Sequence, residues 1–323
     1  MNEVVYPRRR MLELLDLSEP ELLAAEQDGV LAPLGGVRET YPIHALSQYR
    51  TALGRHPRPH GLRRQLFLNF KGGTGKTSLS VGYAHRLAEL GHRVLIMDLD
   101  SQGHATKCLG YDGESCDATL YDVLIGGVPI KQVRIETPLT ELHLVPCNLR
   151  MSTVDIALMP LAAREVRLRR ALEDVTADYE YIVMDAPPAF GLLNLNAIVA
   201  SDDLFVPVLA DFLSFHGLKL LFEILDDIET DLEHCLDRIF IVLNQYNPTT
   251  NIARAAREAL QEHYSEFLLP VVVRQCTKFA QASSEGLPIF AFDPRSKGAD
   301  DVQTLIDMTL LRSEAAAAEP SKE

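Results

Sequence analysis

Residues 71–78 read Lys-Gly-Gly-Thr-Gly-Lys-Thr-Ser, and this stretch decides the fold. A short apolar run, Leu66 to Phe70, precedes it, and an amphipathic helix is predicted to begin near Lys76. A strand, a glycine-rich turn and a helix in this order are what a phosphate-binding loop requires. The glycines let backbone N–H groups curl around a polyphosphate without clashes from Cβ atoms. A glycine-rich solvated turn is the alternative, but a second matching element follows downstream.

The loop departs from the common pattern G-x-x-x-x-G-K-[ST], which places glycine at position 70. Phe70 stands there, and a second lysine, Lys71, opens the loop. This form, K-G-G-x-G-K-[ST], is more restrictive than the common one. Lys76 is expected to reach the β- and γ-phosphates, and the Thr77 hydroxyl to ligate Mg²⁺. The predicted nucleotide-binding residues are Lys71, Gly72, Gly73, Thr74, Gly75, Lys76, Thr77 and Ser78.

The composition indicates a soluble globular protein. The 323 residues leave room for one large α/β domain and a small appendage. Hydrophobic residues make up 47% of the chain, and no apolar run approaches transmembrane length. The start of the chain does not have the pattern of a signal peptide. The five cysteines include no C-x-x-C pair, so reduced thiols in a cytoplasm are expected. A net charge of −14 argues against a wholly basic nucleic-acid binder but allows a local basic patch.

From residue 65 onward, short apolar runs alternate with helical patterns. Such runs are typical of strands that are buried on both faces. The predicted class is therefore α/β, a doubly wound and mainly parallel sheet flanked by helices, with its ligand site at the carboxyl ends of the strands. The predicted strands are 65–70, 93–97, 142–145, 180–184, 203–208, 239–243 and 268–271, and the main helical segments are 76–91, 153–175, 212–230 and 250–264.

The first 60 residues read as a separate small module. Ser18 and Glu21 have capping-box spacing, and a turn at Pro33, an extended piece over 37–41 and a helix over 43–53 follow. Helix, helix, wing-like hairpin and helix is the order of a winged helix-turn-helix, and the segment loosely resembles MerR-type DNA-binding domains. A helical cap or a dimerisation module is the alternative. Prolines 57 and 59 with Gly61 predict a boundary near 54–64, in a linker with five arginines between Arg50 and Arg64.

Two further strands deliver carboxylates. The strand at 93–97 leads into Asp98 and Asp100, which at positions i and i+2 could both face a bound phosphate. One could orient a water and the other support a magnesium shell, although such residues often only cap the next helix. The run from Tyr181 to Asp185 describes a buried strand that delivers Asp185 toward Mg²⁺. The following loop, with Gly191 as a flexible point, could sense the γ-phosphate.

Three blocks carry a family resemblance. They are FLNFKGGTGKTSLSVGYAHRLAELGHRVLIMDLDSQGHAT at 67–106, YIVMDAPPAFGLLNLNAIVASDDLFVPV at 181–208, and GLPIFAFDPRSKGADD at 286–301. In order and spacing they resemble ParA-type partition ATPases of the ParA/MinD superfamily, over residues 65 to about 312. Phe70 and Ser101 depart from that family's usual pattern. The division that follows is an N-terminal module with a basic linker at 1–60, an ATPase domain at 61–312 and a disordered tail at 313–323.

The resemblance implies roles for single residues. Lys71 would cross a dimer interface to the partner's ATP, and Lys76 would hold the phosphates of its own nucleotide. Asp100 would position the hydrolytic water with support from Asp98, and Asp185 would hold the magnesium shell. The resemblance also places Asn244 at the adenine edge, where an asparagine that caps a turn is nearly as plausible. ATP and Mg²⁺ are the implied cofactors.

The resemblance further implies DNA binding that is independent of sequence. Arg254 and Arg257 are one turn apart on a predicted helix, and Arg274 and Lys278 are assigned to another. A dimer would double such a patch, so binding should weaken steeply with salt. A solvated helix face is the alternative for each pair.

The implied function is a dimeric ATPase switch that coats DNA and drives plasmid or chromosome partition. A centromere-binding, ParB-type partner would stimulate hydrolysis, and the N-terminal module could add operator binding. The implied location is cytoplasmic and nucleoid-associated. The main alternative is the positioning of a protein cargo such as a chemoreceptor array, a carboxysome or a division regulator, through a cargo adaptor protein.

Three other classes fit less well. A MinD-like membrane regulator needs a basic amphipathic C-terminal helix, and this chain ends acidic and alanine-rich. A relative of the nitrogenase iron protein needs paired cysteines for an iron–sulfur cluster. A DNA-binding repressor with a vestigial nucleotide site would not need the complete set of Lys76, Thr77, Asp100 and Asp185.

Overall fold

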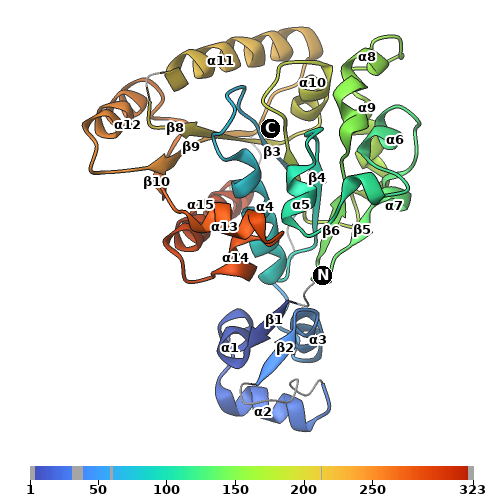
Figure 1. Ribbon diagram of the computed structural model, residues 1–323, viewed down its shortest axis with the longest axis vertical. Helices are drawn as coiled ribbons and strands as arrows, with labels where there is room; N and C mark the ends of the chain where they lie inside the picture. The colour runs from blue at the N-terminus through green and yellow to red at the C-terminus, as the bar shows by residue number, and fades with distance from the viewer. Residues whose placement is uncertain (1–3, 31–38, 59–60, 212, 319–323) are drawn as a thin grey trace.

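The protein is built on one eight-stranded sheet (Figure 1). The computed structural model describes residues 4–30, 39–58, 61–211 and 213–318. The strand order is β10-β9-β8-β3-β7-β4-β6-β5, and each neighbouring pair is parallel except β5 with β6. The strands are β3 (Arg63–Phe67), β4 (Val94–Asp98), β5 (Ile135–Glu136), β6 (Leu142–Val145), β7 (Tyr181–Asp185), β8 (Asp203–Leu209), β9 (Arg238–Tyr246) and β10 (Leu268–Arg274).

The seven predicted strands and the doubly wound class are confirmed. Of the eight strands of this sheet, only the antiparallel edge strand β5 was not predicted, because two residues give no readable alternation. The parallel order brings the carboxyl ends of β3, β4 and β7 to one edge, where a doubly wound sheet binds its ligand.

Two hydrophobic cores cover the two faces of the sheet. Leu66 belongs to one core and Phe67 to the other, as alternation along a strand requires. On the Leu66 side lie α6 (Leu120–Leu124), α7 (Ile130–Val133), α8 (Val154–Leu158), α9 (Arg167–Leu172), α10 (Leu192–Val199), α11 (Leu213–Leu232) and α12 (Asn251–His263). On the Phe67 side lie α4 (Lys76–Glu89), α5 (His104–Cys108), α14 (Ile289–Phe292) and α15 (Lys297–Ala318), and α13 (Lys278–Ser284) packs against α5 and α14.

One predicted helix, 153–175, is wrong as a single element. The structure divides it into α8 and α9, with turns between them. Pro160 lacks the N–H that an unbroken helix would need, and Ala163 has a left-handed φ of 50°. Both short helices pack against α10, and α9 also packs against α6.

The N-terminal elements are β1 (Val5–Pro7), α1 (Arg8–Leu15), α2 (Glu19–Gln27), β2 (Thr40–Pro42) and α3 (Ala45–Ala52). The predicted capping box is present: the Ser18 N–H donates to Glu21 Oε2 at 2.8 Å. β2 pairs antiparallel with β1, which precedes the first helix, so β2 is not paired within a local hairpin. The predicted turn at Pro33 and the residues Val37 and Pro59 lie outside the described residues.

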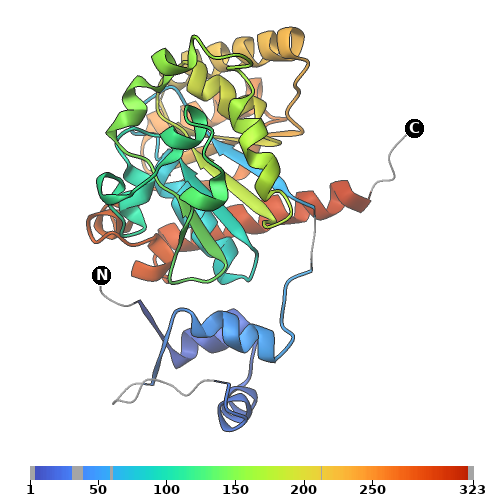
Figure 2. The ribbon, with the colours of Figure 1, turned by 90° about the vertical axis from the view of Figure 1, so that its right-hand side faces the viewer.

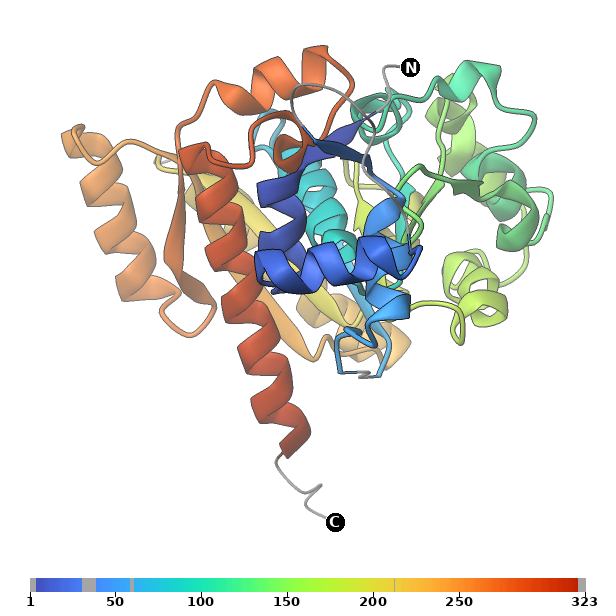
Figure 3. The same cartoon turned by 90° about the horizontal axis from the view of Figure 1, so that it is seen from below.

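These elements dock on the end of α4 that lies away from the phosphate-binding loop (Figures 1 and 3). Glu89 is fully buried there, and its carboxylate accepts hydrogen bonds from Tyr6 at 2.5 Å, Arg10 at 2.8 Å and Arg86 at 2.9 Å. Arg50, only 1% exposed, donates to the Glu89 carbonyl at 2.7 Å. Burial opposes ionisation of Glu89, but the neighbouring cations outweigh it and hold its pKa below the usual range. The module and the sheet domain therefore share one buried ionic junction.

Glu89→Ala is expected to lower the free energy of unfolding by about 3–5 kcal/mol, because Arg10 and Arg86 would keep buried charges without their partner. Denaturant unfolding followed by circular dichroism measures this change. Glu223→Ala is the matched control, since Glu223 is 60% exposed and pairs with Lys219 at the surface. An equally small effect of both substitutions would show that the junction is not stabilised by Glu89.

Helix α15 extends away from the sheet domain toward the C-terminus (Figure 2). It continues to Ala318, so the predicted disordered tail at 313–323 overlaps a helix, and residues 319–323 lie outside the described part. No helix among the described residues is long and apolar enough to span a membrane. All five cysteines are free, as reduced thiols would be.

Candidate nucleotide-binding site

The loop between β3 and α4 has the backbone of a phosphate cradle. Gly73 has φ 74° and Gly75 has φ 87°, and residues with a side chain rarely adopt these backbone conformations. A Cβ atom at Gly72 or Gly73 would meet no other atom within 4 Å, so the backbone there faces open space. The first residue of α4 is Lys76, as predicted, and the N-terminal N–H groups of this helix point toward the loop.

Lys76 lies buried beneath this loop. It is 7% exposed, and its Nζ donates to the carbonyl of Lys71 at 3.4 Å. Burial lowers the pKa of Lys76, and the nearby Asp185 and Asp100 offset only part of that effect. Among the described residues no carboxylate lies within ion-pair distance of its ammonium group. A desolvated cation without a close anion is suited to bind an anionic ligand.

Thr77 and Asp185 meet beside the loop. The Thr77 hydroxyl donates to Asp185 Oδ2 at 2.7 Å, while the buried Asp185 Oδ1 has no hydrogen-bond partner in the described part of the chain. Asp185 is fully buried and lies next to Asp98 across the β4–β7 ladder. Burial, and then the charge of Asp98, raise the pKa of Asp185 to about 8. An unpartnered carboxylate oxygen beside a threonine hydroxyl is a donor set that fits Mg²⁺.

The strand ends at Asp98, and Asp100 lies just beyond it. That both carboxylates face a bound phosphate stays a prediction. Asp98 is fully buried and accepts hydrogen bonds from the N–H and hydroxyl of Thr106, at 2.8 and 2.7 Å. Its Oδ1 accepts from the Asp100 N–H at 3.1 Å. Burial raises the pKa of Asp98 to about 6. Asp98 therefore positions the turn, and Asp100 is the more accessible carboxylate.

Lys71 forms an ion pair within its own chain. Its Nζ lies 2.7 Å from Asp211 Oδ2, just beyond the end of β8, and both side chains are about one-third exposed, at 32% and 34%. The Lys71 N–H donates to Asn69 Oδ1 at 2.9 Å. The sequence analysis did not single out Asp211. An acidic residue at or just beyond the end of a buried strand is the signal it shares with Asp98 and Asp185.

Asn244 contacts the loop in this structure. Its Nδ2 donates to the Thr74 carbonyl at 2.7 Å, and a Cβ atom on Gly75 would lie only 2.2 Å from that nitrogen. Gln245 donates to the Gly73 carbonyl at 3.0 Å. The end of β9 thus fixes the loop, and the predicted adenine contact of Asn244 stays a prediction.

The unusual Phe70 has a partner in the loop that follows β7. Its ring packs edge-on against Phe190 at a centroid distance of 5.7 Å. Asn194 of α10 donates to the Pro187 carbonyl of this loop at 3.1 Å. The two loops around the site therefore contact each other through aromatic rings.

The four predicted DNA-binding residues do not lie on two helices. Arg254 and Arg257 are exposed on α12, where Arg257 lies over the Tyr246 ring at 5.7 Å. Arg274, however, ends strand β10 and pairs with Asp301 at 2.8 Å, whereas Lys278 begins α13 and lies 3.6 Å from Asp293. The two residues are not one helical turn apart, because the chain is still extended at Arg274 and becomes helical only at Lys278. Arg274 thus has a structural partner that the sequence pattern did not reveal.

Comparison with known proteins agrees with this geometry. A family model described as an AAA domain matches residues 65–238. The chain is 57% identical over 318 residues to the cell division protein PomZ of Myxococcus xanthus, covering 98% of this chain and 97% of that protein. It is 31% identical over 265 residues to the chromosome partitioning protein ParA of the same species, covering 81% and 94%. A cobyrinic acid a,c-diamide synthase from Mycobacterium smegmatis, solved with an ATP analogue and magnesium, is similar with a TM-score of 0.67 at 26% identity, covering 81% and 100%.

Proposed function

This chain belongs to the ParA-type P-loop ATPases, and we propose that it binds ATP, dimerises and hydrolyses ATP to position a cargo in the cell. The observation that carries the proposal is the convergence of Lys76, Thr77, Asp100 and Asp185 around one glycine-rich loop. A positioning ATPase is the role that the family names support. The substrate, the oligomer and the DNA scaffold below are our proposals.

Each residue has one task in this reaction. Lys76 holds the β- and γ-phosphates, and the loop N–H groups around Gly73 and Gly75 bind the remaining phosphate oxygens. Thr77 and Asp185 hold magnesium, which when bound supplies positive charge to the phosphate oxygens. The unpartnered Asp185 Oδ1 supports this assignment.

Asp100 is proposed to orient the attacking water, since Asp98 holds its backbone N–H in place at 3.1 Å. Asp100→Ala is expected to lower the hydrolysis rate by about 10²–10⁴-fold and to leave ATP binding nearly unchanged. Phosphate release and fluorescent-nucleotide titration measure the two quantities. Asp117→Ala, at an exposed acid outside the site, is the control. Normal turnover in Asp100→Ala would assign the water to another group.

A homodimer is proposed to form through the face that carries Lys71. Large apolar side chains are exposed on the segments that follow β6 and β7: Ile156 at 71%, Phe190 at 59%, Leu149 at 58% and Met159 at 56%. α8, which carries Ile156, is joined to the start of α10, just after the loop containing Phe190, because Asp155 accepts a hydrogen bond from the Leu193 N–H at 2.8 Å. Exposed apolar groups of this size favour a protein partner.

For the cargo we propose a division-site assembly. The match to a cell division protein covers 98% of this chain, including the N-terminal module, whereas the match to the chromosome partitioning protein covers 81%. Plasmid or chromosome partition through a ParB-type partner remains the second candidate. Imaging of a tagged copy beside the stained nucleoid, the division site and the chromosome origins distinguishes them, since each predicts a different final location. The proposed location is cytoplasmic and on the nucleoid.

The N-terminal module is proposed to be a structural cap on α4. Helix α2 would be the recognition helix of a winged-helix domain, yet its nine residues include three glutamates and no lysine or arginine. Operator binding needs cations near the phosphates. The buried contacts of Arg10 and Arg50 with Glu89 support the cap.

DNA binding independent of sequence is proposed to use Arg254, Arg257 and Lys278. With a non-hydrolysable ATP analogue, the protein should bind an arbitrary DNA duplex, and binding should weaken with salt. Alanine at all three positions should weaken binding and reduce the log–log salt slope by about 0.9 for each phosphate contact removed. Arg274→Ala is the control, because Asp301 already neutralises that side chain. A salt slope that is unchanged in the triple variant would place the DNA elsewhere on the protein.

A further inference from the structure

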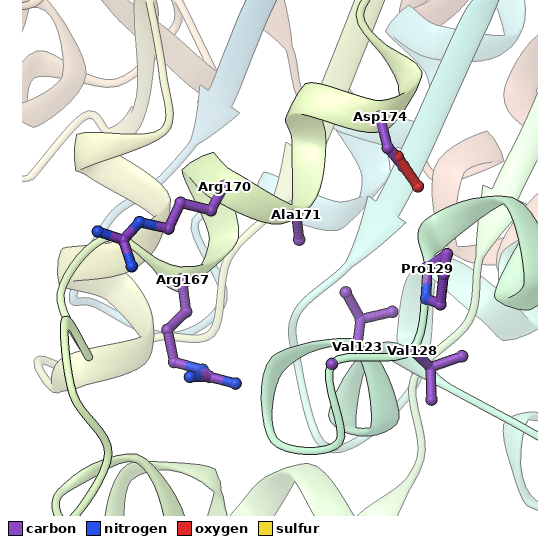
Figure 4. Close-up of a pocket in the computed structure, with 8 residues that line it drawn as sticks. Val123, Val128, Pro129, Arg167, Arg170, Ala171 and Asp174 are labelled. Carbon is purple, nitrogen blue, oxygen red and sulfur yellow. The ribbon is translucent and has the colours of Figure 1, made fainter.

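A cavity lies between α9 and the α6–α7 segment (Figure 4). These elements lie on the flank of the sheet domain (Figure 1). Its volume is about 400 Å³, which is within the range of roughly 300–1,000 Å³ that small-ligand pockets occupy. Its residues are Val123, Gly127, Val128, Pro129, Arg167, Arg170, Ala171 and Asp174. No residue of the nucleotide site lines it, so it is a separate feature of the molecule.

The walls of this cavity are apolar on one side and basic on the other. Val123, Val128 and Pro129 come from the α6–α7 segment, and Ala171 faces them from α9 (Figure 4). Such walls favour an aliphatic or aromatic group over a hydrated ion. The cavity is therefore suited to an apolar side chain.

The basic side of the cavity forms no ion pair within the described ranges of the chain. Arg170 is exposed, and among the described residues no carboxylate lies within ion-pair distance of Arg167 or Arg170. This is unusual in a protein of net charge −14, where carboxylates outnumber basic groups. By contrast, the nearby Arg150 pairs with Asp122 at 2.8 Å. Two arginines facing one acid, Asp174, leave the rim positive.

The cavity is also preformed. Arg167 Nε donates to the Leu124 carbonyl at 2.5 Å, which joins α9 to the end of α6. The fully buried Asn196 of α10 accepts from the Leu168 N–H at 3.1 Å and donates to the Arg164 carbonyl at 2.6 Å. These bonds fix α9 on both sides, so a ligand would lose little free energy in ordering the site.

We propose that this cavity docks an acidic protein segment, with one apolar side chain inserted against Val123, Val128 and Ala171 and flanking carboxylates on Arg167 and Arg170. A nucleic acid fits less well, because Asp174 would repel phosphates and apolar walls offer a backbone phosphate no hydrogen bonds. The proposal does not depend on nucleotide chemistry, since binding can be measured without ATP.

The test uses the full chain and an array of short peptides in which the number of glutamates and the identity of one apolar residue vary independently. Binding by fluorescence anisotropy is expected to rise with both features. Arg170→Glu should weaken the best peptide at least about tenfold, as expected for reversing one close charge contact. Ala171→Phe should weaken it similarly by filling the cavity. Arg169→Glu is the matched control, because Arg169 is exposed on the same helix but does not line the cavity.

Thermal unfolding of each variant shows whether the fold is retained, and Arg170 is suited to substitution because its side chain is exposed. Any one of four results would overturn the proposal. The first is that no peptide binds, and the second is that polyglutamate without an apolar residue binds equally well. The third is that Arg169→Glu weakens peptide binding as much as Arg170→Glu does. The fourth is that Arg170→Glu weakens binding to a DNA duplex but not to the peptide. The last result would assign the arginines to nucleic acid.

Discussion

Replacing Lys76 with alanine is expected to abolish ATP binding at working concentrations. Lys76 is 7% exposed and has no carboxylate partner among the described residues, so the nucleotide phosphates would be its main anionic contacts. Removing one member of a buried, hydrogen-bonded charge pair costs about 2–5 kcal/mol. This corresponds to a dissociation constant that is roughly 30-fold to several-thousand-fold higher. Titration with a fluorescent ATP analogue measures this loss directly.

The same substitution should not harm the nucleotide-free protein. Burial lowers the pKa of Lys76, which means that the folded state disfavours its charged form, and removing the charge relieves that cost. Lys76→Ala should therefore keep or raise the unfolding temperature without ATP. The wild type should gain about 2.7 kcal/mol at ATP concentrations a hundredfold above the dissociation constant, and the variant almost nothing. Lys219→Ala, at a lysine that is 78% exposed, is the control. Tight ATP binding by Lys76→Ala would remove the assignment of the loop.

The sequence could predict the sheet because its strands carry a local signal. β7 reads Tyr-Ile-Val-Met-Asp, four mostly apolar residues ending in an acid, and all five are buried. The ends of such strands must meet at one edge of a parallel sheet, so Asp185 and Lys76 could be assigned to one site before their contacts were known. The division of the segment 153–175 was harder to foresee, because its apolar periodicity continues on both sides of the turn at Ala163.

The remaining features depend on which strands become neighbours. Asp211 meets Lys71 because β8 lies beside β3, although the two residues are 140 positions apart in the chain. Glu89 reads as an ordinary polar residue near the end of a helix, and only the docking of Arg10 and Tyr6 makes it a buried junction. Asp98, the last residue of β4, accepts a hydrogen bond from the Thr106 hydroxyl. Long-range partners of this kind leave no mark on local spacing.

The contact between Lys71 and Asp211 bears on how the proposed dimer would form. A lysine that serves the partner's nucleotide must first leave Asp211, 2.7 Å away. Because both side chains are about one-third exposed, this ion pair contributes at most about 1 kcal/mol, so dimer contacts can replace it at small cost. Asp211→Asn should therefore let the ATP-bound dimer form at a few-fold lower protein concentration.

Lys71→Ala is expected to bind ATP within a few-fold of the wild type and to lose ATP-dependent dimerisation. Hydrolysis should fall by up to about 10³–10⁵-fold, the range for a cation supplied in trans to phosphoryl transfer, since the transition-state charge lies on oxygens that Lys71 would contact. Size exclusion with light scattering measures the dimer, and phosphate release measures the rate. Lys71→Arg keeps a cation and should restore part of both. If Lys71→Ala dimerises and turns over normally, the lysine acts only within its own chain, and its ion pair with Asp211 would be its whole role.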